Sequence, residues 1–153
     1  MSPIVLPKEH FGAMFGGKVS AYTLVIDNGK FLLVQRAKEG RTGGRTGEWD
    51  LPGGKAVIAE SPQAAARRVT KEETGLDVQV REPLTMISRL ESKITMEALV
   101  IMIFRATITT PGQVSLSREH KAYKWVTKKE LANLSTVSYV QSAVESAESQ
   151  GFL

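Results

Sequence analysis

The chain has 153 residues, of which 42% are hydrophobic and 24% are charged, so we expect one folded domain across residues 1–153 with a substantial core. It has no cysteine and only two histidines, which excludes disulfides, thiolate metal sites and a cysteine nucleophile. Any metal would therefore be held by oxygen, as Mg²⁺ and Mn²⁺ prefer. The net charge of +4 suits small anionic substrates as well as nucleic acid.

The amino-terminal part is predicted to hold an irregular arm and a β-hairpin. Proline and glycine recur through residues 1–16, which indicates an arm without regular structure. Residues 18–26 and 30–36 have the pattern of strands, and Asn28-Gly29 between them favours a tight hairpin turn. The chain has no apolar run of membrane-spanning length and no signal-peptide pattern, so a cytoplasmic location without a membrane segment is the default expectation.

A helix is predicted in the middle of the chain. Residues 37–47 form a loop rich in glycine and arginine, and the sequence WDLPGG after it predicts a short extended piece and a turn. Ser61 suits the N-cap of a helix and Pro62 its first position. The helix is predicted to end near Thr74, with Gly75 as its stop.

The remaining segments complete the predicted fold class. Strands are expected near residues 77–88, 94–108 and 121–127. A short helix is expected over residues 128–134, and apolar residues at helical spacing predict an amphipathic helix over residues 136–149. This order of elements predicts an α+β fold in which helices pack on a mixed β-sheet.

The predicted central helix ends in two adjacent carboxylates, Glu72 and Glu73. They lie about 100° apart around a helix and could bracket one cation, and position 69 faces the same way. On spacing alone, a solvated acidic helix end is the more common explanation of such a pair. The residues around the pair favour the cation site.

The stretch from Gly54 to Leu76 resembles the Nudix box. That motif has Gly, five residues, Glu, seven residues, then Arg-Glu-apolar-any-Glu-Glu-any-Gly-apolar. Gly54, Glu60, Arg68, Glu72, Glu73, Gly75 and Leu76 all fall in register, after a typical Leu-Pro-Gly-Gly. With the hairpin before it and Trp125 after it, the resemblance covers roughly residues 18–135 and implies a Nudix-like α/β/α sandwich.

The resemblance implies a role for each matching residue. The Gly53 carbonyl, Glu72 and Glu73 would hold Mg²⁺ or Mn²⁺, and the two glutamates would be catalytic. Glu60 and Arg68 would pair to brace the loop against the helix, a structural role. Glu119 lies six residues before Trp125, where several family members have a further metal ligand or general base. A surface carboxylate is an equally good interpretation of Glu119.

The pattern breaks at one position. Val69 stands where the family has the first glutamate of its Arg-Glu motif, and Thr70 occupies the apolar position after it. The missing carboxylate is normally a principal metal ligand and is often proposed to activate the attacking water, and valine has no lone pair to offer. With Ala65, Val69 could simply form an apolar helix pair. Other carboxylates could substitute, namely Glu48, Glu91, Glu97 and Glu119.

Several basic residues are candidates for binding phosphate. Arg36 and Lys55 flank the expected site, and Arg41 and Arg45 offer forked donors in the glycine-rich loop. A surface loop without such a role is the commoner explanation of the last two. His120, beside Glu119, could carry a proton, although most lone histidines are incidental.

Trp49 could stack on a base, and packing beneath the glycine turn is the commoner role for it.

Three functions are compatible with these observations. The resemblance implies a metal-dependent pyrophosphohydrolase acting on a nucleoside diphosphate linked to another moiety, with activity that Val69 could impair. The alternative is a Nudix-fold protein that binds or senses a nucleotide without hydrolysing it. An RNA-directed enzyme is disfavoured because no aromatic-basic platform or basic tail is visible. The expected partner is a small nucleotide, and by analogy with the family a homodimer.

Overall fold

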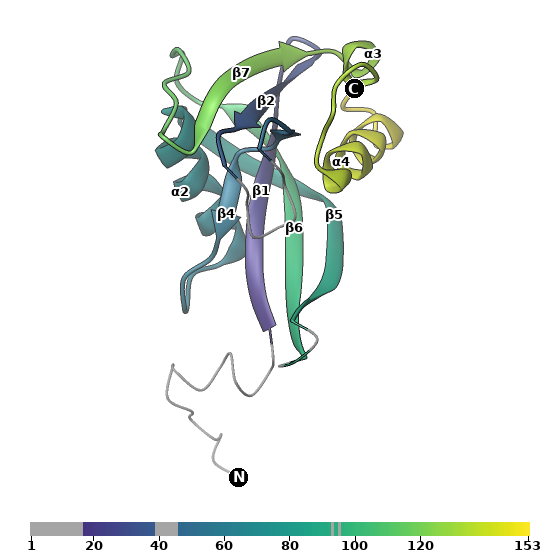
Figure 1. Ribbon diagram of the computed structural model, residues 1–153. Helices are drawn as coiled ribbons and strands as arrows, with labels where there is room; N and C mark the ends of the chain where they lie inside the picture. Colours follow the sequence, from purple (N-terminus) through teal and green to yellow (C-terminus); the bar gives the residue numbers. More distant parts are fainter. Residues whose placement is uncertain (1–16, 39–45, 93, 95) are drawn as a thin grey trace.

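The computed structural model describes residues 17–38, 46–92, 94 and 96–153. Over these residues the chain forms a mixed sheet with helices on both faces (Figure 1). The predicted arm over residues 1–16 lies outside the described residues. The strands are β1 (Gly17–Asp27), β2 (Lys30–Arg36), β3 (Trp49–Asp50), β4 (Gly53–Lys55), β5 (Val78–Ser92), β6 (Glu97–Ile108) and β7 (His120–Val126). The helices are α2 (Pro62–Thr74), α3 (Lys128–Leu131) and α4 (Ser138–Ser149).

The sheet is built around β1. Its strand order is β3-β2-β1-β6-β5, while β4 pairs with β1 and β7 pairs with β2. The β1–β6 pair is parallel, and the other pairs are antiparallel. Asn28 and Gly29 have positive φ angles of 51° and 74°, as the predicted hairpin turn between β1 and β2 requires.

Helices cover the two faces of this sheet, as Figure 1 shows with α2 on one side and α4 on the other. Ala65 and Ala66 of α2 pack on Ala21 and Phe104. On the opposite face, α4 contributes the buried residues Tyr139, Val140, Ala143, Val144 and Ala147 to a larger core. The predicted mixed-sheet sandwich is therefore confirmed.

Several element ends differ from the predictions, and β6 begins at Glu97 instead of residue 94. Strand β5 continues to Ser92, four residues beyond the expected end, as the outer strand of the β6 pair. It tolerates Pro83 because the register shifts on both sides of that residue, and proline in a sheet is confined to edges and bulges. Helix α3 stops at Leu131, three residues early, and α4 begins at Ser138 instead of 136. None of the described helices is long and apolar enough to cross a membrane.

Candidate active site in a carboxylate pocket

Helix α2 is built to present its last two turns to a pocket. Ser61 caps its start by accepting a hydrogen bond from the Ala64 N–H at 3.1 Å, and Gly75 ends it with a φ of 75°. Val69, Glu72 and Glu73 line one pocket of about 490 Å³, as the helical spacing predicted. The other lining residues come from β4, from Arg68 and from the loop before β7: Gly53, Gly54, Lys55, Arg68, Ser117, Arg118 and Glu119.

Gly53 forms one wall of the pocket because it has no side chain. Its φ is 152°, and a Cβ there would lie 2.4 Å from both the carbonyl oxygen of Ala21 and the Cα of Tyr22. The missing side chain lets β4 lie against β1. The Gly53 N–H then donates to Glu73 Oε1 at 2.8 Å, so the glycine turn and the acidic helix end are joined directly.

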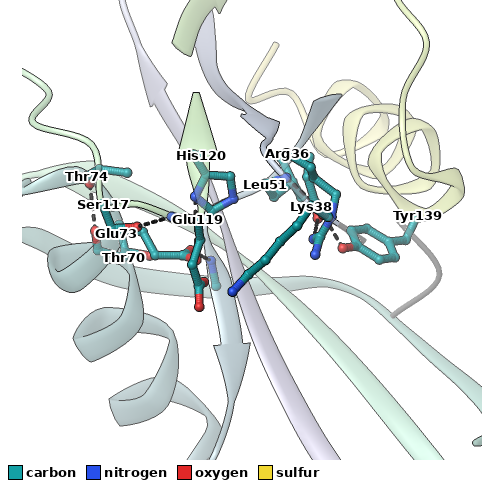
Figure 2. A network of polar contacts seen from close by, with 12 residues as sticks. Arg36, Lys38, Leu51, Thr70, Glu73, Thr74, Ser117, Glu119, His120 and Tyr139 are labelled. Atoms are coloured by element: carbon teal, nitrogen blue, oxygen red, sulfur yellow. Dashed lines mark hydrogen bonds and ion pairs between the residues drawn. The ribbon is translucent and has the colours of Figure 1, made fainter. Parts of the chain in front are cut away.

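The loop before β7 closes the third side and is fixed by main-chain hydrogen bonds. Ser117 donates its N–H to the Glu73 carbonyl at 3.1 Å. The Glu119 carbonyl accepts the Ala37 N–H at 2.9 Å. The loop is thereby tied both to the end of α2 and to the end of β2, and this places Glu119 beside Glu73 (Figure 2).

Glu73 is the most perturbed acid of the pocket. The residue is only 6% exposed, and burial raises the pKa of its carboxyl to about 9. The Gly53 N–H lowers this pKa, whereas the hydrogen bond and the charge of Glu119, and the charge of Asp50, raise it further. Burial and the neighbouring carboxylate of Glu119 thus favour retention of the proton on Glu73, and a bound cation would reverse that preference.

His120 also lies close to Glu73. Its Nδ1 is 3.7 Å from Glu73 Oε2, and this nitrogen is buried without a hydrogen-bond partner among the described residues. Burial lowers the pKa of His120 to about 4, the charge of Arg36 acts in the same direction, and the charge of Glu119 opposes both. The imidazole is therefore neutral at physiological pH.

The two structural residues that the resemblance implies form a bidentate ion pair. Arg68 donates from Nε to Glu60 Oε2 at 2.8 Å and from Nη2 to Glu60 Oε1 at 2.9 Å. These bonds lower the pKa of the Glu60 carboxyl. Arg68 also donates to Glu72 Oε1 at 3.1 Å and to the Lys55 carbonyl at 3.2 Å. The guanidinium therefore binds the loop before α2, the strand β4 and the helix itself.

Val69 fills the place of the missing carboxylate with methyl groups. The side chain is 9% exposed, and a Cβ on Gly54 would lie 3.3 Å from its Cγ1. The neighbouring Thr70 is buried and shares a 2.8 Å hydrogen bond with Thr23, so this apolar position of the box carries a satisfied hydroxyl. The helix of the box is therefore formed, and the site has one carboxylate fewer than the family pattern.

A divalent cation is compatible with the donor types of this pocket. Glu72, Glu73 and Glu119 offer carboxylate oxygens, and Gly53 lies beside them with its main chain. Among the described residues, no group of three or more histidine, aspartate or glutamate side chains is already arranged to hold a metal. Glu72 lines the pocket, and its carboxylate pairs there with Arg68 at 3.1 Å. Since its side chain is 58% exposed, a change of rotamer would turn this carboxylate toward Glu73 and Glu119.

Arg36 has other partners than the pocket. Its Nη1 donates to Asp50 Oδ2 at 2.8 Å, and Tyr139 donates its hydroxyl hydrogen to Asp50 Oδ1 at 2.6 Å (Figure 2). Burial raises the pKa of Asp50, although the bonds from Tyr139, Leu51 and Arg36 act against it. This cluster joins β2 and β3 to α4, so Arg36 contributes a cross-link of the fold and does not line the pocket.

The other sequence candidates fall outside the pocket or outside the described residues. Arg41, Arg45 and the side chain of Glu91 are not described. Glu97 faces Lys18 at 3.6 Å, and Glu48 is not among the lining residues. Trp49 is buried in the core and does not line the pocket.

Two lining residues, Ser117 and Arg118, were missed from the sequence. Their only signal was their place just before Glu119, because the loop that brings them to α2 is fixed by long-range main-chain bonds.

Comparisons with known proteins agree with this geometry. A model of the NUDIX domain matches residues 16–143. A "MutT-like protein" of Streptomyces ambofaciens is 29% identical over 86% of this chain and 77% of its own length. The "Putative 8-oxo-dGTP diphosphatase 2" of Mycobacterium tuberculosis is 32% identical over 69% of this chain and 70% of its own.

A solved structure shows the same fold. The MutT protein from Methanosarcina mazei is 26% identical and superposes with a TM-score of 0.71, over 88% of this chain and 96% of the other. Together with the box from Gly54 to Leu76 and the pocket that it builds, these matches show that the chain belongs to the Nudix pyrophosphohydrolase family.

Proposed function

We propose that this chain hydrolyses the phosphoric anhydride of a nucleoside diphosphate linked to another group, with Mg²⁺ or Mn²⁺ as cofactor. The observation that carries the proposal is the pairing of Glu73 with Glu119 in a pocket that is also lined by the cationic side chains of Lys55 and Arg118. Carboxylates alone would repel a phosphate chain. A site that combines both charges suits a substrate that arrives with a divalent cation.

Each residue has a role in this proposal. Glu72, Glu73 and the Gly53 carbonyl would hold the cation. When bound, such a cation polarises a phosphate oxygen and lowers the pKa of coordinated water. Lys55 and Arg118 lack a side-chain partner within the described part of the chain, so they are free to bind phosphate oxygens.

The exposed Glu119 is the proposed general base. It would take a proton from water as the water oxygen bonds to phosphorus, while the bridging oxygen leaves with the other phosphate.

The relatives give the substrate panel. One relative bears the name of an 8-oxo-dGTP diphosphatase, so dGTP and 8-oxo-dGTP should be assayed beside a nucleoside diphosphate sugar such as ADP-ribose. Purified protein is incubated with each compound and Mg²⁺ or Mn²⁺, and the phosphate products are measured. The variant E73Q should lose turnover. Absence of turnover with every compound, together with absence of metal binding, would refute the proposal.

The pocket cations can be tested separately from the carboxylates. Removing Arg118 or Lys55 should raise KM by about 10- to 100-fold, because a hydrogen bond to a charged group contributes about 1.5–3 kcal/mol. R67A is the matched control, since Arg67 is an exposed arginine of helix α2 that lines a different groove. If R67A raised KM as much as R118A, overall charge and not the pocket would explain the effect.

A nucleotide-binding protein without hydrolysis is the second candidate, and Val69 is the observation that favours it. The variant V69E restores the carboxylate of the box, and V69A opens the same space without adding one. If the remaining site is intact, V69E should raise kcat by about 10²- to 10⁴-fold, as a positioned acid–base group does, and V69A should not. Tight nucleotide binding by the wild type and V69E, with no product from either, would favour the binding protein.

A further inference from the structure

His120 is buried beside the pocket, next to Glu73, and has no role in the proposed chemistry. Its side chain is 4% exposed, and its Nδ1 has no hydrogen-bond partner among the described residues. Buried polar atoms are nearly always satisfied, so an orphaned nitrogen next to the pocket residue Glu73 calls for an explanation. The carboxylate oxygen Oε2 of Glu73 lies 3.7 Å from this nitrogen, which is within about 1 Å of a normal hydrogen-bond distance.

Glu73 already has one oxygen fixed. Oε1 accepts the Gly53 N–H at 2.8 Å, and that donor cannot move because a strand of the sheet carries it. A second donor at Oε2 would stop rotation of the carboxylate about its last bond. His120 and Gly53 approach different oxygens of the same group, and Figure 2 shows the imidazole next to this carboxylate.

The backbone holds His120 firmly in this position. It is the first residue of β7 and pairs with Arg36 of β2, and its N–H donates to the Ser117 carbonyl at 3.3 Å. A neutral imidazole also suits the place chemically. A lysine or arginine would neutralise Glu73 and compete with a cation for it, whereas an imidazole N–H orients the carboxylate and leaves its charge available.

We infer that His120 is the positioning residue of Glu73: its Nδ1–H donates to Glu73 Oε2 when the pocket holds a divalent cation, and so directs the carboxylate toward that cation. The inference rests on the proposed function, because it needs a cation in the pocket. It assigns a role to a residue outside the box from Gly54 to Leu76.

Three substitutions of His120 separate the effect of its hydrogen-bond donor from the effect of its ring volume. In H120N the amide nitrogen occupies the place of Nδ1, whereas in H120Q it occupies the place of Nε2, and H120L has no donor. Mn²⁺ affinity is measured by electron paramagnetic resonance on the folded variants. We expect H120N to stay within about threefold of the wild type and H120Q and H120L to lose about 10- to 100-fold, as the loss of a partner behind a metal ligand does.

Nuclear magnetic resonance gives a readout that a purely structural role would not change. The chain has only two histidines, so the H120N spectrum assigns the imidazole nitrogens of His120. In the Mg²⁺-saturated protein, we expect the proton on Nδ1. A proton on Nε2 with a bare Nδ1 would overturn the inference, even if H120L failed to fold.

The affinity data distinguish the two proposals. Equal Mn²⁺ affinity in the wild type, H120Q and H120N would overturn the role of His120 alone. Equal weakening in H120Q and H120N would overturn it as well, since ring volume would then be the cause. Absence of Mn²⁺ binding in the wild type would overturn the proposed function, and the role of His120 with it.

Discussion

Replacing Glu73 by glutamine should change how the stability of the protein depends on pH. Burial and the neighbouring Glu119 raise the pKa of Glu73 from 4.5 to about 9. Between these two pH values the native protein binds a proton that the unfolded chain lacks. The free energy of unfolding therefore falls as the pH rises through this window, and the loss is complete above about pH 9. Below pH 4.5 both states hold the proton.

The size of the effect follows from one proton. When one proton is bound only in the native state, the free energy of unfolding falls by about 1.4 kcal/mol for each pH unit. Between pH 7.0 and pH 8.5 the free energy of unfolding of the wild type should thus fall by about 2 kcal/mol, and that of E73Q should not show this fall. His120 does not disturb this range, because its pKa falls from 6.5 in the unfolded chain to about 4, and its contribution changes only below pH 6.5.

Urea unfolding in EDTA at several pH values measures this difference. The control is E72Q, the same substitution on the adjacent residue. The side chain of Glu72 is 58% exposed, whereas that of Glu73 is buried. E72Q should follow the slope of the wild type, whereas E73Q should be flatter. Parallel stability curves for the wild type and E73Q would show that the native protein does not retain a proton at Glu73, and the electrostatic account of the pocket would be wrong.

Two further predictions concern the structure around the pocket. G53A should lower the free energy of unfolding in urea by about 3–5 kcal/mol, because of strain at a φ of 152° and a Cβ placed 2.4 Å from the Tyr22 Cα. The control G54A, whose Cβ would meet a methyl group of Val69 at 3.3 Å, should lower it by under about 1 kcal/mol. Equal losses would contradict the close approach of β4 to β1. E60Q should have a lower Tm than the wild type at pH 7, and this difference in Tm should close as the pH falls below 4.5. The reason is that the bonds from Arg68 lower the pKa of Glu60 and stabilise the fold only while its carboxyl is ionised. A difference in Tm that persists in acid would show that packing, and not charge, is its cause.

The local parts of the fold could be predicted from the sequence, and the site only in part. Helix α2 carries its boundaries in its own residues, since Ser61 and Gly75 cap it through local bonds. The box then placed Glu72 and Glu73 on one face by helical geometry alone. The sequence predicts that Arg36 binds substrate, and this stays a prediction. The contact that the structure adds is to Asp50 on another strand, which also accepts a hydrogen bond from Tyr139, 89 residues further along the chain. No local pattern encodes that contact.

Position 69 links the stability of the site to its chemistry. The pocket already holds Glu72, Glu73 and Glu119, and a fourth carboxylate at position 69 would add repulsion next to a Glu73 that already retains its proton. Val69 instead packs its methyl groups against Gly54. V69E should therefore have a lower Tm than the wild type in EDTA and a larger rise in Tm when Mg²⁺ is added, because the cation would bind one more oxygen ligand. A V69E protein that is as stable as the wild type in EDTA, and that gains no more from Mg²⁺, would show that position 69 does not face the cation in this chain.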